Sequence, residues 1–416
     1  MTDPERAQRQ EIAAVVRYWM RRRGLTRQVF ADRMGKSLSW VDKIRAGDRQ
    51  LDRLSVLRQI AGVLDVPLAV LIDPEAAEHR QSCPDDREIE AVRQALRRYD
   101  AITNVFRPDG DDLPEPNLAK LKHMVRYGWM AFQATNYQAI GQLLADLIYE
   151  AQAAVWQLRT GERTQAQTWL AWAYQLTAAT ALKLGDAQLG WVAADRGIQM
   201  AEQTGDLTLI GSAARRVAHA LSTTHQSNDS VQLVKSAANR LEPHLRGADP
   251  AFVSAYGMLL LKGSIAAARL DHAAEVRDFQ DEALAVAAHL EMDRNEHWSA
   301  FGRTNVLVHR VSALADMQSG GLVIEAAAKI PLGDLMRLPR ERRASHLLDV
   351  TRGHLQAGQR DQASVTLLEA DQLAPQEVRC RDLTRKILTD LVRSYPRGLS
   401  PTSGVIRLAR TIGITV

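Results

Sequence analysis

The stretch 25–49, LTRQVFADRMGKSLSWVDKIRAGDR, constrains the fold of this chain more than any other part of its sequence. It places the small residue Ala31 four positions before Gly35, and apolar residues follow six and nine positions after that glycine. A small side chain lets two helices cross closely, and glycine accepts the left-handed conformation that a sharp helix exit needs. The spacing therefore predicts two short helices joined by a tight turn.

Apolar residues at helical spacing predict which faces of these two helices are buried. In the first helix they are Val29, Phe30 and Met34, and in the second they are Val41 and Ile44. Together with the turn, this arrangement is the helix-turn-helix pattern. The competing interpretation is a helical hairpin inside a larger bundle, but the filled positions and the flanking cap residues favour the helix-turn-helix.

The second helix of such a motif presents its N-terminal residues to base edges in the major groove of DNA. Leu38, Ser39 and Lys43 fall on its outer face, so we expect them to meet the bases. Basic and polar side chains around them could reach phosphate oxygens, which position a protein on DNA without reading its sequence. The predicted DNA-binding residues are Arg27, Gln28, Lys36, Ser37, Leu38, Ser39, Trp40, Lys43, Arg45 and Arg49.

The same stretch resembles the lambda- and 434-type repressor family, also called the XRE family. The family pattern LTQxELA…GVSxxxVSxLERG appears here as LTRQVFA…GKSLSWVDKIRAG. Arg27 stands where the family usually has Gln, and Arg45 where it usually has Glu, so both departures add positive charge. Further helices are predicted over residues 6–23, 52–65 and 68–72. The resemblance implies a five-helix DNA-binding domain, which we place at residues 1–75.

The distribution of charge agrees with contact to DNA. Residues 1–75 hold 14 basic and 10 acidic residues, whereas the rest of the chain holds 39 of each. The net charge of +4 therefore lies on the part of the chain that would meet phosphates. An alternative function is a protein-interaction scaffold whose helix-turn-helix is only a docking module. The basic excess counts against it, because docking does not require that charge.

Residues 76–116 read as a linker with one helix. The helix is predicted from residue 87 to about residue 107, and the stretch PDGDDLPEP at 108–116 must be a loop. Its acidic residues do not follow the spacing of a calcium-binding EF-hand loop. We therefore expect a solvated connection here and no metal site.

Residues 117–416 read as a long succession of helices of about 17–25 residues, separated by short turns. Breaks are predicted at Gly185-Asp186, Gly205-Asp206, Asn228-Asp229, Asp271, Gly320-Gly321 and Gly358. Two helices between breaks give a pair length near 40, longer than the roughly 34 residues of a strict tetratricopeptide repeat. The chain is thus predicted to be all-α, with the N-terminal domain followed by a tetratricopeptide-like solenoid that offers a concave surface.

Phrases in this long region resemble the helical C-terminal domain of actinomycete XRE-type regulators. They include LGWVAADRGIQMAEQTGD, WSAFGRTNVLVHRVSALADM and LPRERRASHLLDVTRGHLQAGQRDQA. The resemblance implies a transcriptional regulator whose array dimerises and senses a peptide or small-molecule effector. The expected partners are then double-stranded operator DNA, a second copy of the chain and that effector. A symmetric homodimer implies a pseudo-palindromic operator.

Polar residues on otherwise apolar predicted helices are the candidates for binding an effector. Trp298, Asn305 and His309 are expected on one helix, with the last two four positions apart and hence on one face. The competing interpretation is that such groups bond to neighbouring helices and organise the solenoid, because buried polar groups need partners. Trp156, Trp169 and Trp172 are expected in the core. The candidate ligand-binding residues are Arg215, Arg216, His219, Trp298, Arg303, Asn305 and His309.

Motifs of catalysis and metal binding are missing from the sequence. It holds no Walker loop, no G-x-G-x-x-G after a strand, no H-E-x-x-H and no C-x-x-C, so we expect no enzyme activity, cofactor or metal. Cys83 and Cys380 are far apart and are expected to be thiols in a reducing compartment. With no signal peptide and no apolar run approaching a membrane span, we expect a cytoplasmic protein without a membrane partner.

Overall fold

The computed structural model describes residues 3–51, 53–73, 77, 83–97, 113–396 and 400–414. Within these residues every regular element is a helix, and the β-type pairing is confined to one bridge between Arg294 and Phe301. The chain separates into two compact units, Met1–Gln81 with Ile406–Val416, and Ser82–Val405. The all-α prediction is confirmed, with a helix-turn-helix domain followed by a helical-repeat solenoid.

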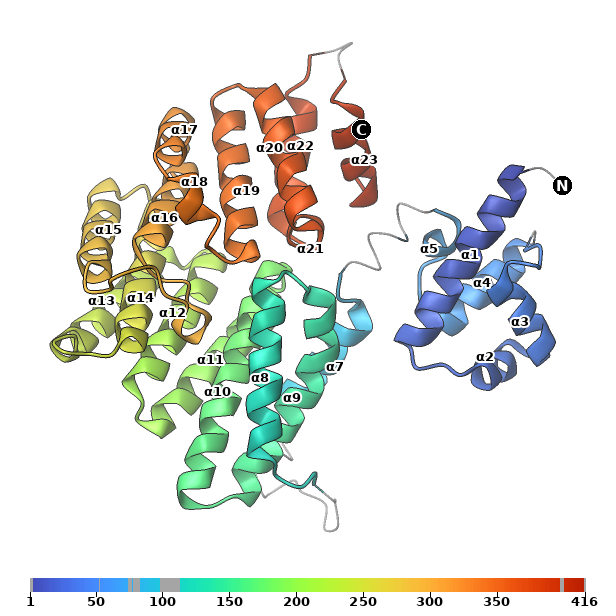
Figure 1. Ribbon diagram of the computed structural model, residues 1–416, viewed down its shortest axis with the longest axis horizontal. Coiled ribbons are helices and arrows are strands. Elements are labelled where there is room, and N and C mark those ends of the chain that lie inside the picture. The colour runs from blue at the N-terminus through green and yellow to red at the C-terminus, as the bar shows by residue number, and fades with distance from the viewer. Residues whose placement is uncertain are drawn as a thin grey trace. The chain divides into compact units, whose positions relative to one another are not determined.

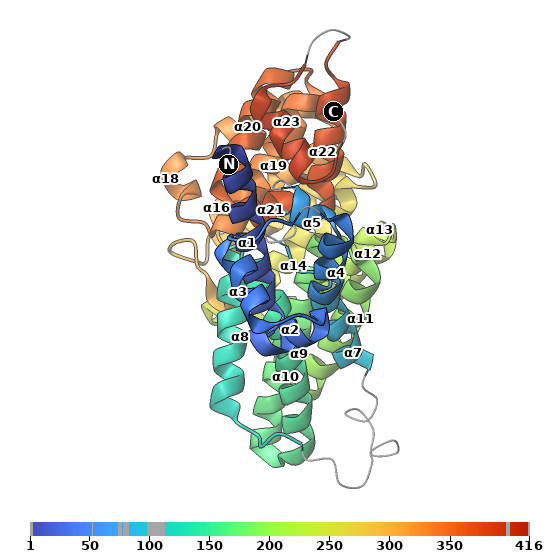
Figure 2. The ribbon, with the colours of Figure 1, turned by 90° about the vertical axis from the view of Figure 1, so that its right-hand side faces the viewer.

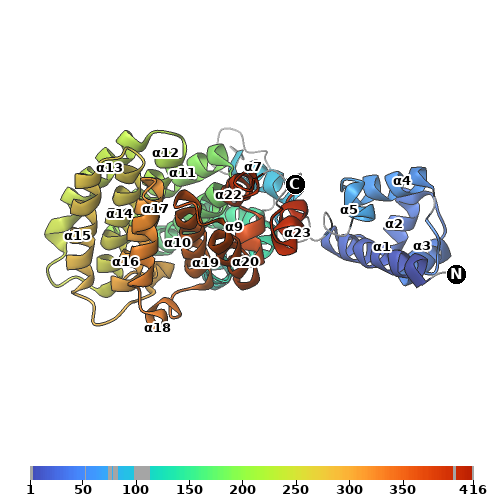
Figure 3. The same ribbon diagram turned by 90° about the horizontal axis from the view of Figure 1, so that it is seen from above.

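The described residues 3–73 of the first unit contain five helices, as predicted, and Figure 3 shows them gathered into one group. They are α1 (Asp3–Arg22), α2 (Arg27–Met34), α3 (Leu38–Ala46), α4 (Leu54–Leu64) and α5 (Ala69–Ile72). Their core includes Trp19, Phe30, Ile44 and Ile60, all almost fully buried. The prediction that Val29 faces inward is wrong, since it is 38% exposed. It lies about 100° around the helix from the buried Phe30.

The turn between α2 and α3 has the predicted geometry. Gly35 adopts φ 61° and ψ 39° at the end of α2. The Ser37 hydroxyl accepts a hydrogen bond from the amide of Trp40 at 3.3 Å and so caps α3. Thr26 caps α2 in the same way, accepting from the amide of Val29 at 3.2 Å. These local bonds set the direction in which α3 leaves the turn.

The second unit begins with α7 (Asp86–Arg97), which corresponds to the helix predicted in the linker. The remainder of that predicted helix, and most of the predicted loop at 108–116, lie outside the described residues. Residues 113–117 have no regular structure, as expected of the loop.

The solenoid follows as a series of helices joined by short turns, with α8, α9 and α10 side by side in two views (Figures 1 and 2). The elements are α8 (Leu118–Gln133), α9 (Tyr137–Gln157), α10 (Thr160–Lys183), α11 (Ala187–Thr204), α12 (Leu207–Thr223), α13 (Ser227–Leu241), η2 (Glu242–His244), α14 (Pro250–Ala268), α15 (Ala273–Ala287), η3 (Glu296–Trp298), α16 (Arg303–Asp316), α17 (Gly320–Ala328), α18 (Leu332–Leu335), α19 (Arg340–Gln356), α20 (Arg360–Leu373), α21 (Pro375–Arg379) and α22 (Asp382–Arg393). The last helix, α23 (Ser403–Thr411), spans the division between the two units at residue 406.

Four of the six predicted breaks separate helices. At two of them glycines in the left-handed region end a helix, and Asp186 and Asp206 then cap the next one through their carboxylates. Two predicted breaks are wrong, because Asn228-Asp229 lies in the first turn of α13 and Gly320 begins α17. Gly320 instead permits close packing, since a Cβ there would lie 2.6 Å from the carbonyl oxygen of Gly353 in α19.

Helix pairs form the repeating unit of the solenoid. In each pair the first helix packs against the helix that follows it in sequence. The pairs are α8 with α9, α10 with α11, α12 with α13, α14 with α15, α16 with α17, and α19 with α20. The short helix α18 stands outside these pairs. The first helices of successive pairs also contact one another, α10 with α12, α12 with α14 and α14 with α16. The first helices therefore form an inner layer, as the tetratricopeptide-like arrangement requires.

Helix α14 departs from the prediction that no apolar run approaches a membrane span. Among the helices of the described part of the chain, it alone is long and apolar enough for one, at 19 residues. Its window is nevertheless 89% buried inside the protein, where it packs against α12, α13, α15 and α16. A core helix enclosed on all sides has the same composition, because each of its faces meets apolar neighbours.

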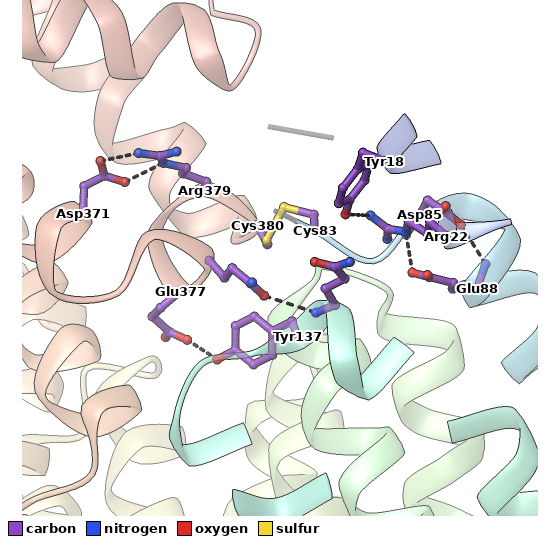
Figure 4. Close-up of a disulfide and its surroundings, with 12 residues drawn as sticks. Tyr18, Arg22, Cys83, Asp85, Glu88, Tyr137, Asp371, Glu377, Arg379 and Cys380 are labelled. Atoms are coloured by element: carbon purple, nitrogen blue, oxygen red, sulfur yellow. Dashed lines mark hydrogen bonds and ion pairs between the residues drawn. A yellow bond between two sulfur atoms is a disulfide. The ribbon is translucent and has the colours of Figure 1, made fainter. Parts of the chain in front are cut away.

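The two cysteines form a disulfide, so the prediction of two thiols is wrong (Figure 4). Cys83 precedes α7 and Cys380 follows α21, with their Cα atoms 5.6 Å apart. They are 297 positions apart in sequence, and only the packing of the solenoid brings them together. Beside them, the guanidinium of Arg379 donates two hydrogen bonds to the carboxylate of Asp371, at 2.8 and 2.9 Å.

Candidate DNA-contact surface and ligand cavity

The outer face of α3 carries the residues predicted to meet bases. Leu38 is 43% exposed, and Ser39 and Lys43 are also exposed. Within the described residues the Lys43 ammonium has no hydrogen-bond or ion-pair partner, so it is available to donate hydrogen bonds to a partner outside the chain. Lys43 lies in the last turn of α3 and shares the outer face with Ser39, four residues earlier in the first turn, where base edges are met in helix-turn-helix proteins.

Three other predicted DNA-binding residues take part in structural contacts. Ser37 uses its hydroxyl as the cap of α3, and Trp40 is 8% exposed and belongs to the core of the N-terminal unit. The Arg49 guanidinium lies 5.8 Å from the centre of the Trp40 ring, a cation–π contact. The indole therefore positions Arg49 while being largely withdrawn from the surface.

Asp42 forms ion pairs with two of the predicted DNA-binding arginines. Its carboxylate lies 3.3 Å from Arg27 and 3.8 Å from Arg45, and all three side chains remain partly exposed. Such surface ion pairs are weak, so the guanidinium groups are held near α3 yet can exchange partners. Gln28 donates to Asp32 at 2.8 Å, and Lys36 is exposed beside the turn.

The other candidate site is a cavity of about 460 Å³ inside the solenoid. Its walls come mainly from the inner layer, helices α8, α10, α12, α14, α16 and α19, together with α22 and the segment before α16. Pockets that hold small molecules have volumes of about 300–1,000 Å³. The cavity is therefore large enough for one small organic molecule.

Five of the seven predicted ligand-binding residues line this cavity, namely Arg215, Arg216, His219, Trp298 and His309. The other two do not. Arg303 is exposed at the start of α16, and Asn305 is fully buried, donating its side-chain amide to the carbonyl of Ala300 at 2.9 Å. Asn305 therefore has a structural role instead of binding a ligand, because its side chain holds the segment that precedes α16.

That segment also corrects the prediction that Trp298 shares a helix with Asn305 and His309. Trp298 lies in the short 3-10 turn η3, with φ 57°, several residues before α16 begins. Phe301 anchors the segment against Gly257, where a Cβ would lie 1.9 Å from the ring. Any residue larger than glycine at position 257 would therefore collide with the Phe301 ring. With Phe301 fixed in this way, Trp298 lies against Trp129 of α8 and Trp172 of α10.

Aromatic rings support one side of the cavity. Trp298 stacks on Trp129 with ring centres 5.6 Å apart, and it meets Trp172 edge-on at 5.5 Å. The Arg216 guanidinium lies 5.1 Å from the centre of the Trp129 ring. Trp172 is buried, as predicted, whereas Trp156 and Trp169 are half-buried.

Positive charge dominates the cavity lining. Nine basic residues line it, Lys183, Arg215, Arg216, Lys262, Arg269, Arg342, Arg352, Arg381 and Lys386, against the four acidic residues Asp316, Glu341, Asp349 and Asp382. Most of the acidic groups are already paired. Arg352 contacts Asp316 at 2.7 Å and Asp349 at 3.1 Å, and Lys183 contacts Glu341 at 2.5 Å. The carboxylates thus compensate only some of the cations.

Three cations have no carboxylate partner among the described residues, Arg215 and Arg216 of α12 and Lys262 of α14. Burial, reinforced by the charges of Arg216 and Arg342, lowers the pKa of Arg215 well below its usual value. Burial, together with Arg342 and Arg269, does the same to the pKa of Lys262. Burial also lowers the pKa of Arg216 to about 10. The Nε atoms of both arginines are buried without a hydrogen-bond partner. This part of the wall is therefore electrostatically uncompensated.

A buried carboxylate closes the solenoid around the cavity. Glu377 of α21 accepts hydrogen bonds from the Tyr137 hydroxyl (Figure 4), from Lys183 at 2.5 Å and from Arg381 at 2.8 Å. Burial and the charge of Glu377 raise the pKa of Tyr137, so its hydroxyl remains a donor. Since Tyr137 begins α9 and Glu377 lies 240 positions later, this contact joins the two ends of the array.

The sequence pattern did not identify several of the cavity's cations. Lys183, Lys262, Arg342 and Arg381 stand on four different elements, and nothing in their local spacing relates them. The sequence offered one signal for a cationic cavity, namely the number of basic residues on the helices expected to form the inner layer. As for metals, no group of three or more His, Cys, Asp or Glu side chains in the described residues could hold an ion.

Comparisons with known proteins give little similarity. The sequence matches no family model and no curated protein. Among solved structures, the crystal structure of Bacillus thuringiensis PlcR in complex with the peptide PapR7 and DNA matches 68% of this chain and 96% of that chain. The identity is 16% and the TM-score is 0.25, so the match carries no conclusion about the function of this chain.

Proposed function

We propose that this protein is a sequence-specific DNA-binding transcriptional regulator. Its helix-turn-helix would read an operator through α3, and its solenoid would hold an effector, a peptide or small molecule, in the cavity. The proposal includes no catalytic reaction and no cofactor.

The observation that carries the proposal is the free face of α3. Ser39 and Lys43 are exposed in the first and last turns of a capped helix, and no described side chain engages the Lys43 ammonium. Arg27, Lys36 and Arg49 surround that helix with exposed positive charge. A lysine can donate to guanine O6 and N7 in the major groove, whereas the surrounding cations suit phosphates.

Replacing Lys43 with Ala tests the assignment. We expect a loss of about 1–3 kcal/mol in binding free energy at the preferred site, with relaxed preference at one base pair. Binding titrations of the purified chain on a selected duplex and on randomised duplexes, at several salt concentrations, measure both effects. The preferred duplex is obtained first by selection from a random library.

Lys122 offers a matched control, because it is an exposed lysine on α8 of the solenoid. The Lys122→Ala variant should bind every duplex as the unmodified protein does. An equal loss on all duplexes for Lys43→Ala would assign Lys43 to phosphate contact instead. No selectable duplex at all would favour the docking-module alternative.

A further inference from the structure

The uncompensated cations of the cavity are its most informative feature. Arg215 is only 5% exposed, and Arg216 and Lys262 are half-buried beside it. None of the three has a carboxylate within ion-pair distance in the described structure, and Glu341, whose charge acts on both arginines, is engaged by Lys183. Buried cations without partners destabilise a fold, so a fold that keeps three of them together needs negative charge from elsewhere.

We propose that the cavity binds a small phosphorylated molecule, with its phosphate held by Arg215, Arg216 and Lys262. Only the role of this molecule as an effector rests on the proposed function. Its binding to the cavity does not depend on whether the protein binds DNA. The molecule would be the effector that the solenoid senses.

The charge balance favours a phosphate over a single carboxylate. A phosphate monoester carries a charge of about −1.5 to −2 and three acceptor oxygens, whereas a carboxylate neutralises one cation at most. Two guanidinium groups can each donate a pair of parallel hydrogen bonds to such oxygens, and the Lys262 ammonium adds a compact third donor. Three different donors around one phosphate thus satisfy groups that lack partners in the protein.

The remaining wall fits the organic part of the ligand. The carboxylates on α16 and α19 are already paired with Arg352 and Lys183, so the uncompensated positive charge lies on the side of α12 and α14, where the phosphate would bind. Trp298, Met258 and Val308 line the same cavity and supply apolar surface. Arg342 on α19 has an unpartnered buried Nε, so a ligand on α12 could also bridge to the C-terminal part of the array.

The test uses the full-length chain in buffers free of phosphate. Isothermal titration calorimetry and thermal melting are measured with pyrophosphate, inorganic phosphate and citrate, the last being a tricarboxylate without phosphorus. We expect one pyrophosphate per chain and a raised Tm, weaker binding of inorganic phosphate, and still weaker binding of citrate. Absence of binding by both phosphates would overturn the proposal, as would citrate binding as tightly as pyrophosphate.

The Lys262→Met variant separates ligand binding from a structural role. Methionine keeps most of the side-chain volume and removes the charge, so the free protein should melt at a higher temperature than the unmodified protein. Its affinity for pyrophosphate should fall about tenfold or more, because a charge-assisted hydrogen bond is lost. A variant that melts lower, or that keeps full affinity, would contradict the assignment.

Arg310 provides the matched control for the arginines, since it is exposed on α16 next to His309. Arg216→Gln should weaken pyrophosphate binding about tenfold or more, whereas Arg310→Gln should not change it. Equal effects of the two substitutions would mean general attraction of anions and would overturn the site. DNA titrations on the same samples keep the two proposals apart, because either activity can fail while the other is retained.

Discussion

At the scale of single residues, two cavity histidines show what burial among cations does. Burial lowers the pKa of His219 well below its usual value, and Lys262 and Arg216 lower it further. Burial, together with Arg342 and Lys262, likewise lowers the pKa of His309, although its hydrogen bond to the Asn305 carbonyl acts in the opposite direction. Both imidazoles therefore stay neutral in the folded protein at pH values where they are protonated in the unfolded chain.

This difference predicts that acid destabilises the protein. Below the unfolded pKa of about 6.5, the unfolded chain binds more protons than the folded one, so the free energy of unfolding falls as the pH falls. The decrease continues until the pH reaches the lowered pKa values of the folded state. Thermal melting between pH 7.5 and 5.5, in buffers free of phosphate, should show a falling Tm.

Substitution identifies the histidine responsible. His309→Gln should reduce the slope of Tm against pH, because it removes one group whose protonation differs between the two states. His244→Gln is the control, since His244 is exposed in η2. Equal slopes for the His309 variant and the unmodified protein would show that this histidine does not carry the pH dependence.

At the scale of elements, the turn between α2 and α3 controls the direction in which α3 leaves α2. Gly35 has φ 61° and nothing within 4 Å of the position a Cβ would take, so backbone strain alone penalises a larger residue there. Gly62 also has open space around it, but it stands in the ordinary conformation of α4. The two glycines of the same unit thus differ only in the backbone conformation that they need.

Alanine at these two positions should have opposite effects. Gly35→Ala should lower the free energy of unfolding by about 1–2 kcal/mol, the cost of the left-handed conformation for a residue with a Cβ. Gly62→Ala should raise it by up to about 1 kcal/mol, the difference in helix propensity between the two residues. Denaturant unfolding of both variants measures the changes, and a shift of the same sign in both would refute the strain argument.

At the scale of the whole molecule, the modest charge of the proposed DNA-binding domain argues for a dimer. A net charge of +4 on residues 1–75 would give one domain limited attraction to phosphates, and one domain of the proposed kind would contact only a half-site. Tethering two copies raises the effective concentration of the second domain at its half-site, which can increase affinity on the order of a hundredfold or more. We therefore propose that the solenoid forms a two-fold symmetric homodimer.

The dimer predicts the form of the operator. Two half-sites should be related as a pseudo-palindrome, with centres one helical turn apart, about 34–36 Å, or a multiple of that. Light scattering on the free chain should give twice the mass of 46.2 kDa, and footprinting should show two symmetric protected segments. A monomer in solution, or one protected half-site, would be evidence against this arrangement.

The sequence by itself determined the features that local interactions specify. The spacing from Ala31 to Ile44 predicted the helix-turn-helix, because caps, a left-handed glycine and an apolar stripe act within a few residues. The breaks at Gly185-Asp186 and Gly205-Asp206 predicted helix boundaries for the same reason. A glycine can mark either a helix break or a close helix contact, and the local sequence does not distinguish the two. At Gly320 the structure shows a close contact with α19.

Only the tertiary structure decided which distant residues meet. Cys83 bonds to Cys380, Trp298 leaves the predicted helix to stack on Trp129, and the cavity's cations converge from separate helices. These contacts depend on how many helix pairs lie between the partners and how the array closes through Glu377. Local sequence spacing carries no record of that closure, because each contact joins side chains whose backbone conformations are independent of one another.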